Sequence, residues 1–188
     1  MAIEQYLRAS LAATAIVIPV TCFGLTACVT RIKDLSISGV TVDVQRTVPE
    51  IFVDFSTRSD LSQLRRYPVL VHTNSVFCDQ PSEYAVLGWG VGVRDSIREA
   101  HSHWLSLAHA KANSSGLYIY TVAIPVSRKA SPTSIPAEVG FDLQADPRDI
   151  CMRFEGQYLW RGVTSNPVRL TKADIRGAFD RIRETPPN

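Results

Sequence analysis

Histidines are the side chains that come nearest to a catalytic or metal-binding pattern, and the sequence has four: His72, His101, His103 and His109. His101 and His103 stand two residues apart, and on a helix this spacing points two side chains in nearly opposite directions. A zinc-binding pair on a helix needs histidines four residues apart with a glutamate between them, which this chain lacks. On a strand the two would share a face, so that alternative stays open. We interpret the histidines as solvated or capping residues and predict no metal site.

A glycine-rich stretch, Gly88-Trp89-Gly90-Val91-Gly92, is the nearest the chain comes to a phosphate-binding loop. Val93 stands where the dinucleotide fingerprint needs its third glycine, so the motif fails. On a strand the three glycines would share one face, which lets a ring or a second backbone approach closely. That face either packs against a bulky neighbour inside the domain or accepts a partner, and we favour internal packing.

The remaining candidates are a group of aspartates and the serines, and neither has the spacing of a known calcium loop or serine-nucleophile motif. Asp142, Asp146 and Asp149 lie close together, but their spacing does not match a calcium loop. We expect them to be solvated at the surface. No Gly-x-Ser-x-Gly motif is present to expose a nucleophilic serine. The sequence therefore predicts no catalytic residue and no cofactor, and we expect a protein that is not an enzyme.

Length and composition are those of one ordinary folded domain. The chain has 188 residues, of which 45% are hydrophobic and 20% charged, and its formal net charge is +2. That charge is too small to favour nucleic acid, which usually needs a clustered basic face. Apolar residues recur throughout, which argues against an extended disordered chain.

The N-terminal residues have the sequence layout of a targeting signal, and we expect them not to be part of the fold. A short polar start ends at Arg8, and residues 9–30 carry no charged side chain. This layout is typical of a secretory signal. The sequence Leu25-Thr26-Ala27-Cys28 resembles the lipobox of bacterial lipoproteins, an aliphatic residue and two small residues before a cysteine. Cys22 fits the pattern less well, because Thr21 precedes it.

The lipobox resemblance implies cleavage before Cys28, a diacylglycerol on its thiol and an anchor in the membrane. Two or more acyl chains hold a protein on a bilayer where one barely does. In this class an aspartate directly after the cysteine favours retention in the inner membrane, and here that position is Val29. The resemblance therefore implies the outer membrane, with the domain facing the periplasm. We expect a signal peptide at residues 1–27, a lipidated tether at 28–34 and one β-rich domain at 35–188. A transmembrane helix or a buried N-terminal helix in a cytosolic protein remain alternatives.

Two cysteines, Cys78 and Cys151, remain in the mature chain. They are an even pair in a compartment that permits disulfides, and we predict that they are bonded to each other. The alternative is two unrelated buried thiols. Without matching histidines they make a poor zinc site.

Hydrophobic periodicity predicts an α+β domain. Apolar residues alternate with polar ones in 40–44 and again in 150–156, as in half-buried strands. Capping-box sequences at Ser96 and Thr171 predict an inserted helix and a C-terminal helix. We expect a mostly antiparallel sheet or a small sandwich, with strands near residues 40–44, 51–56, 68–78, 83–93, 117–126, 137–143, 150–156 and 163–170.

The predicted partner-binding site is a hairpin at residues 157–162. It carries Tyr158, Trp160 and Arg161, and these residue types are enriched at the centres of protein interfaces. In architecture alone, the expected small lipoprotein is similar to immunity lipoproteins of type VI secretion toxins. That similarity implies a protein that occludes a toxin at the membrane. A structural or assembly lipoprotein of an envelope or secretion complex is the alternative.

Overall fold

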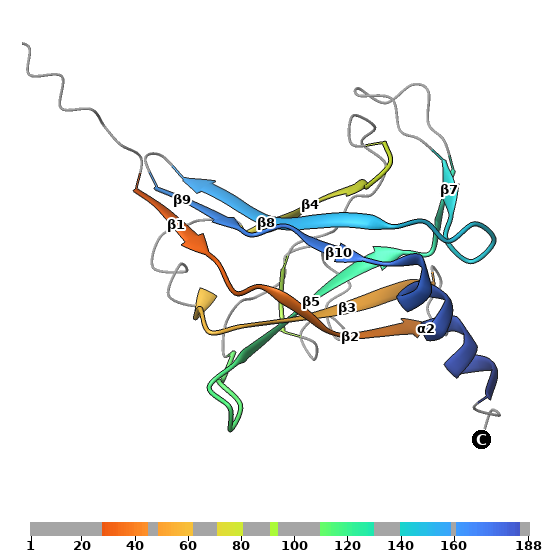
Figure 1. Cartoon of the computed structure of the whole chain (residues 1–188), viewed down its shortest axis with the longest axis horizontal. Helices are drawn as coiled ribbons and strands as arrows, with labels where there is room; N and C mark the ends of the chain where they lie inside the picture. Colours follow the sequence, from red (N-terminus) through yellow and green to blue (C-terminus); the bar gives the residue numbers. More distant parts are fainter. Residues whose placement is uncertain are drawn as a thin grey trace, which may run out of the picture.

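Ten β-strands and one C-terminal helix make up the part of the chain that the structure, a computed structural model, describes (Figure 1). The described residues are 28–44, 49–61, 71–80, 91–93, 110–129, 140–158 and 161–184. The elements are β1 (Cys28–Ile32), β2 (Ser36–Asp43), β3 (Glu50–Thr57), β4 (His72–Phe77), β5 (Tyr118–Pro125), β6 (Ser127–Arg128), β7 (Phe141–Asp142), β8 (Ile150–Tyr158), β9 (Arg161–Ser165), β10 (Val168–Leu170) and α2 (Lys172–Glu184). This content confirms the predicted α+β class. The inserted helix expected from Ser96 lies largely outside these residues, and its described end, 110–113, is not helical.

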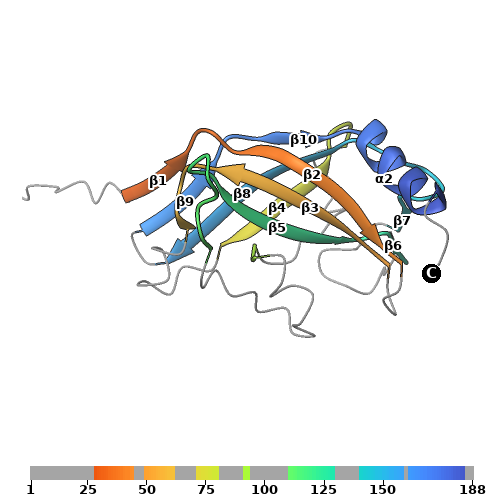
Figure 2. The same cartoon turned by 90° about the horizontal axis from the view of Figure 1, so that it is seen from below.

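The strands form two larger sheets and one small one. The five-stranded sheet has the order β1-β9-β8-β10, with β4 on the other side of β8. The second sheet has the order β2-β3-β5, and β6 pairs with β7 alone. All these pairs are antiparallel except β1 with β9, which is parallel. In both views the start of β1 and helix α2 lie at opposite ends of the sheets (Figure 1 and Figure 2).

One hydrophobic core joins the two larger sheets. Phe55 of β3 and Phe154 of β8 are both fully buried, and their rings meet edge to face with centroids 5.0 Å apart. Strand β8 alternates as predicted, with Ile150, Met152 and Phe154 buried and the residues between them more exposed. Strand β5, which confirms the strand expected at 117–126, is buried on both faces from Tyr120 to Ile124.

A short described segment, residues 91–93, forms hydrogen bonds with both larger sheets. The Val91 amide donates to the Val71 carbonyl at 3.4 Å, just before β4. Gly92 exchanges two backbone hydrogen bonds with Thr121 of β5, at 3.1 and 2.7 Å. Val91 and Gly92 are both buried. Gly92 is therefore packed inside the domain, as we expected for the glycine face. Residues 88–90 of the glycine-rich stretch lie outside the described residues.

The structure corrects the tether expected at residues 28–34. Cys28–Ile32 form β1, which pairs with β9, and Ile32 is buried in the core. The following Asp34 accepts hydrogen bonds from the Thr57 hydroxyl and the Arg58 amide, both at 2.7 Å, and these bonds lower the pKa of its carboxyl. Residues 28–34 are therefore part of the folded domain. The expectation failed because the partner strand is far away in the sequence and leaves no local pattern in β1.

The strand expected at 163–170 is divided in two by Asn166 and Pro167. Pro167 has no amide to donate to the ladder, so pairing stops there. The Asn166 side chain instead accepts from the Leu35 amide and donates to the Leu35 carbonyl, each at 2.9 Å. It thereby fixes the residues that connect β1 to β2 against the end of β9. Of the strand expected at 137–143, the described residues contain only β7.

Helix α2 starts where the capping-box sequence predicted. The Thr171 hydroxyl accepts from the Asp174 amide at 3.1 Å, and the Asp174 carboxylate accepts from the Thr171 amide at 3.0 Å. This reciprocal pair satisfies amides that the first turn leaves unbonded. Ile175, Ala178 and Phe179 form the buried face of the helix, which packs against β2.

Candidate functional site

The structure brings the predicted lipid-bearing residue next to the predicted partner-binding hairpin. Tyr158 is the last residue of β8 and pairs with Arg161, the first residue of β9. Arg161 in turn pairs with Cys28, the first residue of β1. Neighbouring strands lie about 4.8 Å apart, so the three backbones form a row about 10 Å wide. Trp160 and the side chains of the other three residues lie outside what the structure describes.

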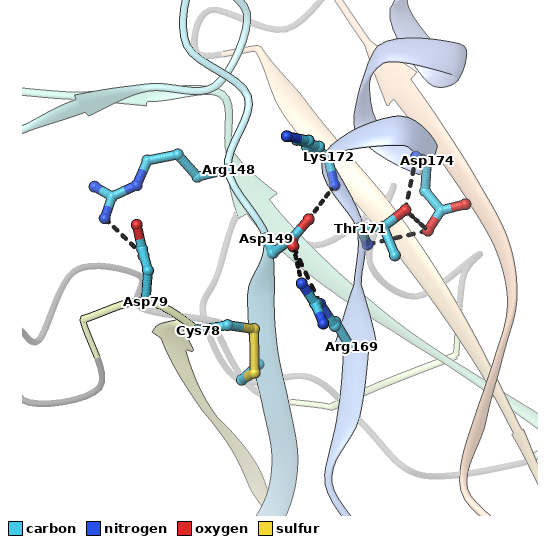
Figure 3. Close-up of a disulfide and its surroundings, with 9 residues drawn as sticks. Cys78, Asp79, Arg148, Asp149, Arg169, Thr171, Lys172 and Asp174 are labelled. Carbon is cyan, nitrogen blue, oxygen red and sulfur yellow. Dashed lines mark hydrogen bonds and ion pairs between the residues drawn. A yellow bond between two sulfur atoms is a disulfide. The ribbon is translucent and has the colours of Figure 1, made fainter.

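The second candidate region surrounds the predicted disulfide, which the structure confirms. Cys78 and Cys151 are bonded, with their Cα atoms 5.1 Å apart (Figure 3). Cys78 follows β4 and Cys151 is the second residue of β8, so the bond fixes the end of one strand to the start of its neighbour. The Cys78 amide also donates to the Asp149 carbonyl at 3.0 Å.

An open pocket of about 400 Å³ lies beside this disulfide. Its lining comes from the turn after β4, the segment before β8, strand β10 and the start of α2, with these residues: Cys78, Asp79, Pro147, Arg148, Asp149, Arg169 and Lys172. Arg148 donates to Asp79 at 2.8 Å and to the Gln80 side chain, and its guanidinium lies 3.9 Å from the centre of the Phe77 ring. Two carboxylates thus face three cations.

Asp149 connects three elements at the pocket (Figure 3). It accepts from Arg169 of β10 twice, from Nε at 3.1 Å and from Nη2, and from the backbone amide of Lys172 at 2.6 Å. The bonds from Arg169, followed by the Lys172 amide, hold the pKa of this carboxyl below its usual range. The Lys172 ammonium makes no ion pair with a described residue. The charges of Asp79 and Asp149 are therefore balanced by the two arginines, and these bonds hold the surrounding segments together. The Lys172 ammonium remains available to an anionic group.

Asp149→Asn is expected to lower the urea midpoint of unfolding at pH 7, because the amide cannot replace the charged bonds to Arg169. Since the folded-state pKa is lowered, the carboxylate stabilises the fold above about pH 4 and loses this effect as the pH falls through the lowered pKa. The difference between variant and parent should therefore shrink in acid. Asp146→Asn is the matched control, because its carboxylate has no hydrogen bond to a described residue. An equal midpoint shift in both variants would contradict the assignment.

The other residues singled out by sequence take ordinary positions or lie outside the described residues. His72 is exposed at the start of β4 and pairs with Glu155. His101, His103 and His109 are not among the described residues. Asp142 caps its own turn by accepting from the Gln144 and Ala145 amides at 2.9 and 3.0 Å. Among the described residues, no group of three or more His, Cys, Asp or Glu side chains is placed to hold a metal ion.

The pocket residues Arg148, Arg169 and Lys172 were not found by sequence reasoning, and Asp149 was expected to be a solvated surface residue. The four residues come from two segments, 148–149 and 169–172, and the pairing of β8 with β10 brings these segments together. The one local signal was Thr171-Lys172-Ala173-Asp174, which located the start of α2 but not the carboxylate that reaches it from before β8.

Comparison with protein-family models, with curated proteins and with solved structures finds no match for this chain. What the fold and the site define is thus a class: a disulfide-bonded α+β domain built mostly of β-sheet. No helix in the described ranges has the length and apolar character needed to span a bilayer.

Proposed function

We propose that this protein is an exported lipoprotein, acylated on Cys28, whose domain binds a protein partner and does not catalyse a reaction. The observation that carries the proposal is the position of Cys28. It lies near the end of the uncharged stretch of residues 9–30, and it is the first residue of the edge strand β1. An acyl chain on this residue would leave from the end of the domain without disturbing the core.

The disulfide supports export as a second, independent observation. Bonds of this kind form and persist in the periplasm and outside the cell and are rare in the cytosol. The Cys78–Cys151 bond closes a long stretch of chain and fixes two strands of the five-stranded sheet. A domain held in this way is suited to an oxidising compartment.

Metabolic labelling with radioactive palmitate tests the anchor. We expect the full chain, expressed in a bacterial host, to take up label and to start at residue 28 after processing. Cys28→Ser should abolish labelling, because the acceptor thiol is gone. Cys22→Ser, the matched control, should label like the parent, because Cys22 lies within the predicted signal peptide. A mature product that retains Met1, or equal labelling of both variants, would refute acylation at Cys28.

The partner is tested by gentle affinity capture from envelope extract, with mass spectrometry of the bound proteins. Within the proposal, the finer candidate is an immunity role in which the domain occludes a secreted toxin. Recovery of a toxin whose lethality the full chain suppresses would support that role. Recovery of secretion or envelope components would favour the assembly role instead. If purified candidate partners of both kinds fail to bind the lipidated full chain, the binding function is wrong.

A further inference from the structure

The end of the five-stranded sheet that contains Cys28 has the residue types of a surface that contacts phospholipid. Cys28, Arg161 and Tyr158 stand in register across β1, β9 and β8. The paired ends of β8 and β9 are therefore beside the residue that we propose to be acylated. An anchor on Cys28 keeps this end of the domain within a few ångströms of the bilayer, whatever the tilt of the sheet.

Strand β1 presents an exposed apolar side chain at this end. Val29 is 47% exposed, although large hydrophobic side chains are mostly buried in the described core. It lies over Gly162, the residue of β9 with which it pairs: a Cβ built on that glycine would be 3.6 Å from a Val29 methyl group. An exposed apolar group beside an acyl chain can insert at the headgroup boundary.

Exposed cations accompany it. Arg31 and Lys33 are both exposed and make no ion pair with a described residue. The nearest carboxylate in the sequence, Asp34, is occupied by Thr57 and Arg58. The sequence adds a third cation and an aromatic residue at the paired positions Arg161 and Tyr158. Basic residues close to a bilayer are attracted by anionic lipids, and tyrosine is enriched at the headgroup level.

We propose that this end of the domain, comprising Val29, Arg31 and Lys33 with the paired positions Tyr158 and Arg161, docks on the surface of an anionic phospholipid bilayer. The proposal rests on acylation of Cys28 and deepens it, because it turns a flexible attachment into a defined orientation. It assigns the paired positions Tyr158 and Arg161 to lipid, where the sequence alone suggested a protein partner.

Docking at this end fixes which face remains free. Cys151 and Tyr158 are seven residues apart on β8, a separation of about 24 Å at about 3.4 Å per residue. The disulfide and the pocket beside it therefore lie at the end of β8 that is away from the anchor. A protein partner would meet the domain at that distal end.

The test measures tryptophan depth in the lipidated full chain. The protein is reconstituted in vesicles of phosphatidylethanolamine and phosphatidylglycerol that contain a brominated phosphatidylcholine as quencher. Trp160 is the reporter, because it directly precedes Arg161 in the sequence. We expect quenching of the parent, and a roughly twofold weaker effect in Trp160→Phe, because residues at the headgroup level are within reach of the quencher.

Charge neutralisation supplies the matched comparison. The double variant Arg31→Gln/Lys33→Gln should reduce quenching of Trp160, because it removes two cations at the docking end. Lys172→Gln/Arg176→Gln removes two exposed cations at the start of α2 and should leave quenching unchanged. Equal effects of the two double variants, or quenching that Trp160→Phe does not alter, would overturn docking.

Palmitate counted on the same preparations separates the two proposals. If palmitate is present and quenching does not depend on Trp160, the anchor stands and docking is wrong. If palmitate is absent from the protein, the proposed function fails and docking fails with it. If Trp160→Phe leaves quenching unchanged but weakens capture of a protein, the hairpin binds that partner and the lipid assignment is refuted.

Discussion

Phe154→Ala is expected to lower the free energy of unfolding by about 3–5 kcal/mol, the range for a fully buried aromatic replaced by alanine. Phe154 is buried to 0% exposure and contacts Phe55 of the facing sheet edge to face. The loss has two parts: the ring no longer leaves water on folding, and the cavity left behind removes contacts from both sheets. Strand β8 is hydrogen-bonded to neighbouring strands on both of its sides, so these strands cannot move easily to fill the cavity.

Urea unfolding followed by circular dichroism measures this effect. Phe141→Ala is the control, because Phe141 also meets an aromatic edge to face, Phe77 at 5.9 Å, but is only partly buried and sits in the short β7. We expect a clearly smaller loss there. If Phe154→Ala cost less than about 1 kcal/mol, an ordinary value for any substitution, the packing of the two sheets through this ring would be wrong.

The elements that the sequence predicted well are those whose pattern is local. In β8 the buried and exposed residues alternate, so one face was clear before any partner strand was known. In β5 an apolar run between turn residues indicated burial on both faces. Thr171 and Asp174 located the start of α2 because both halves of a capping box lie within four residues. Each of these signals reaches no further than the element itself.

The features that sequence reasoning missed depend on residues far apart in the chain. Strand β1 was expected to be a tether because only its parallel pairing with β9, more than 130 residues later, makes it a strand. The side chain of Asn166 forms hydrogen bonds with the backbone amide and carbonyl of Leu35, 131 residues away in the sequence. A polar residue before a proline gives no hint of such a partner.

The pocket was missed for the same reason. Asp149 reads as one of several aspartates in a loop, and its role becomes visible only when β10 brings Arg169 beside β8. The disulfide was predictable for a different reason: counting left only Cys78 and Cys151 after the signal was set aside.

Removal of that disulfide is the second large effect. The double variant Cys78→Ser/Cys151→Ser is expected to lower the free energy of unfolding by up to about 4.5 kcal/mol, the chain-entropy value for a loop of this length. The two cysteines are 73 residues apart, so the bond restricts a large part of the unfolded chain. In the folded state β4 and β8 remain paired up to Phe77 and Ile150 without it.

The measurement is a urea titration of parent and double variant, each with and without a thiol reductant. Reductant should shift the parent toward the double variant and leave the double variant unchanged, which separates loss of the bond from any effect of the serines. The free energy follows from the midpoint and the slope, and a larger slope in the variant would report a more expanded unfolded chain. The loop closed by the bond contains β5 and residues 91–93, so the bond restricts parts of both larger sheets in the unfolded chain. Equal midpoints for oxidised parent and double variant would mean that the bond contributes nothing to the fold.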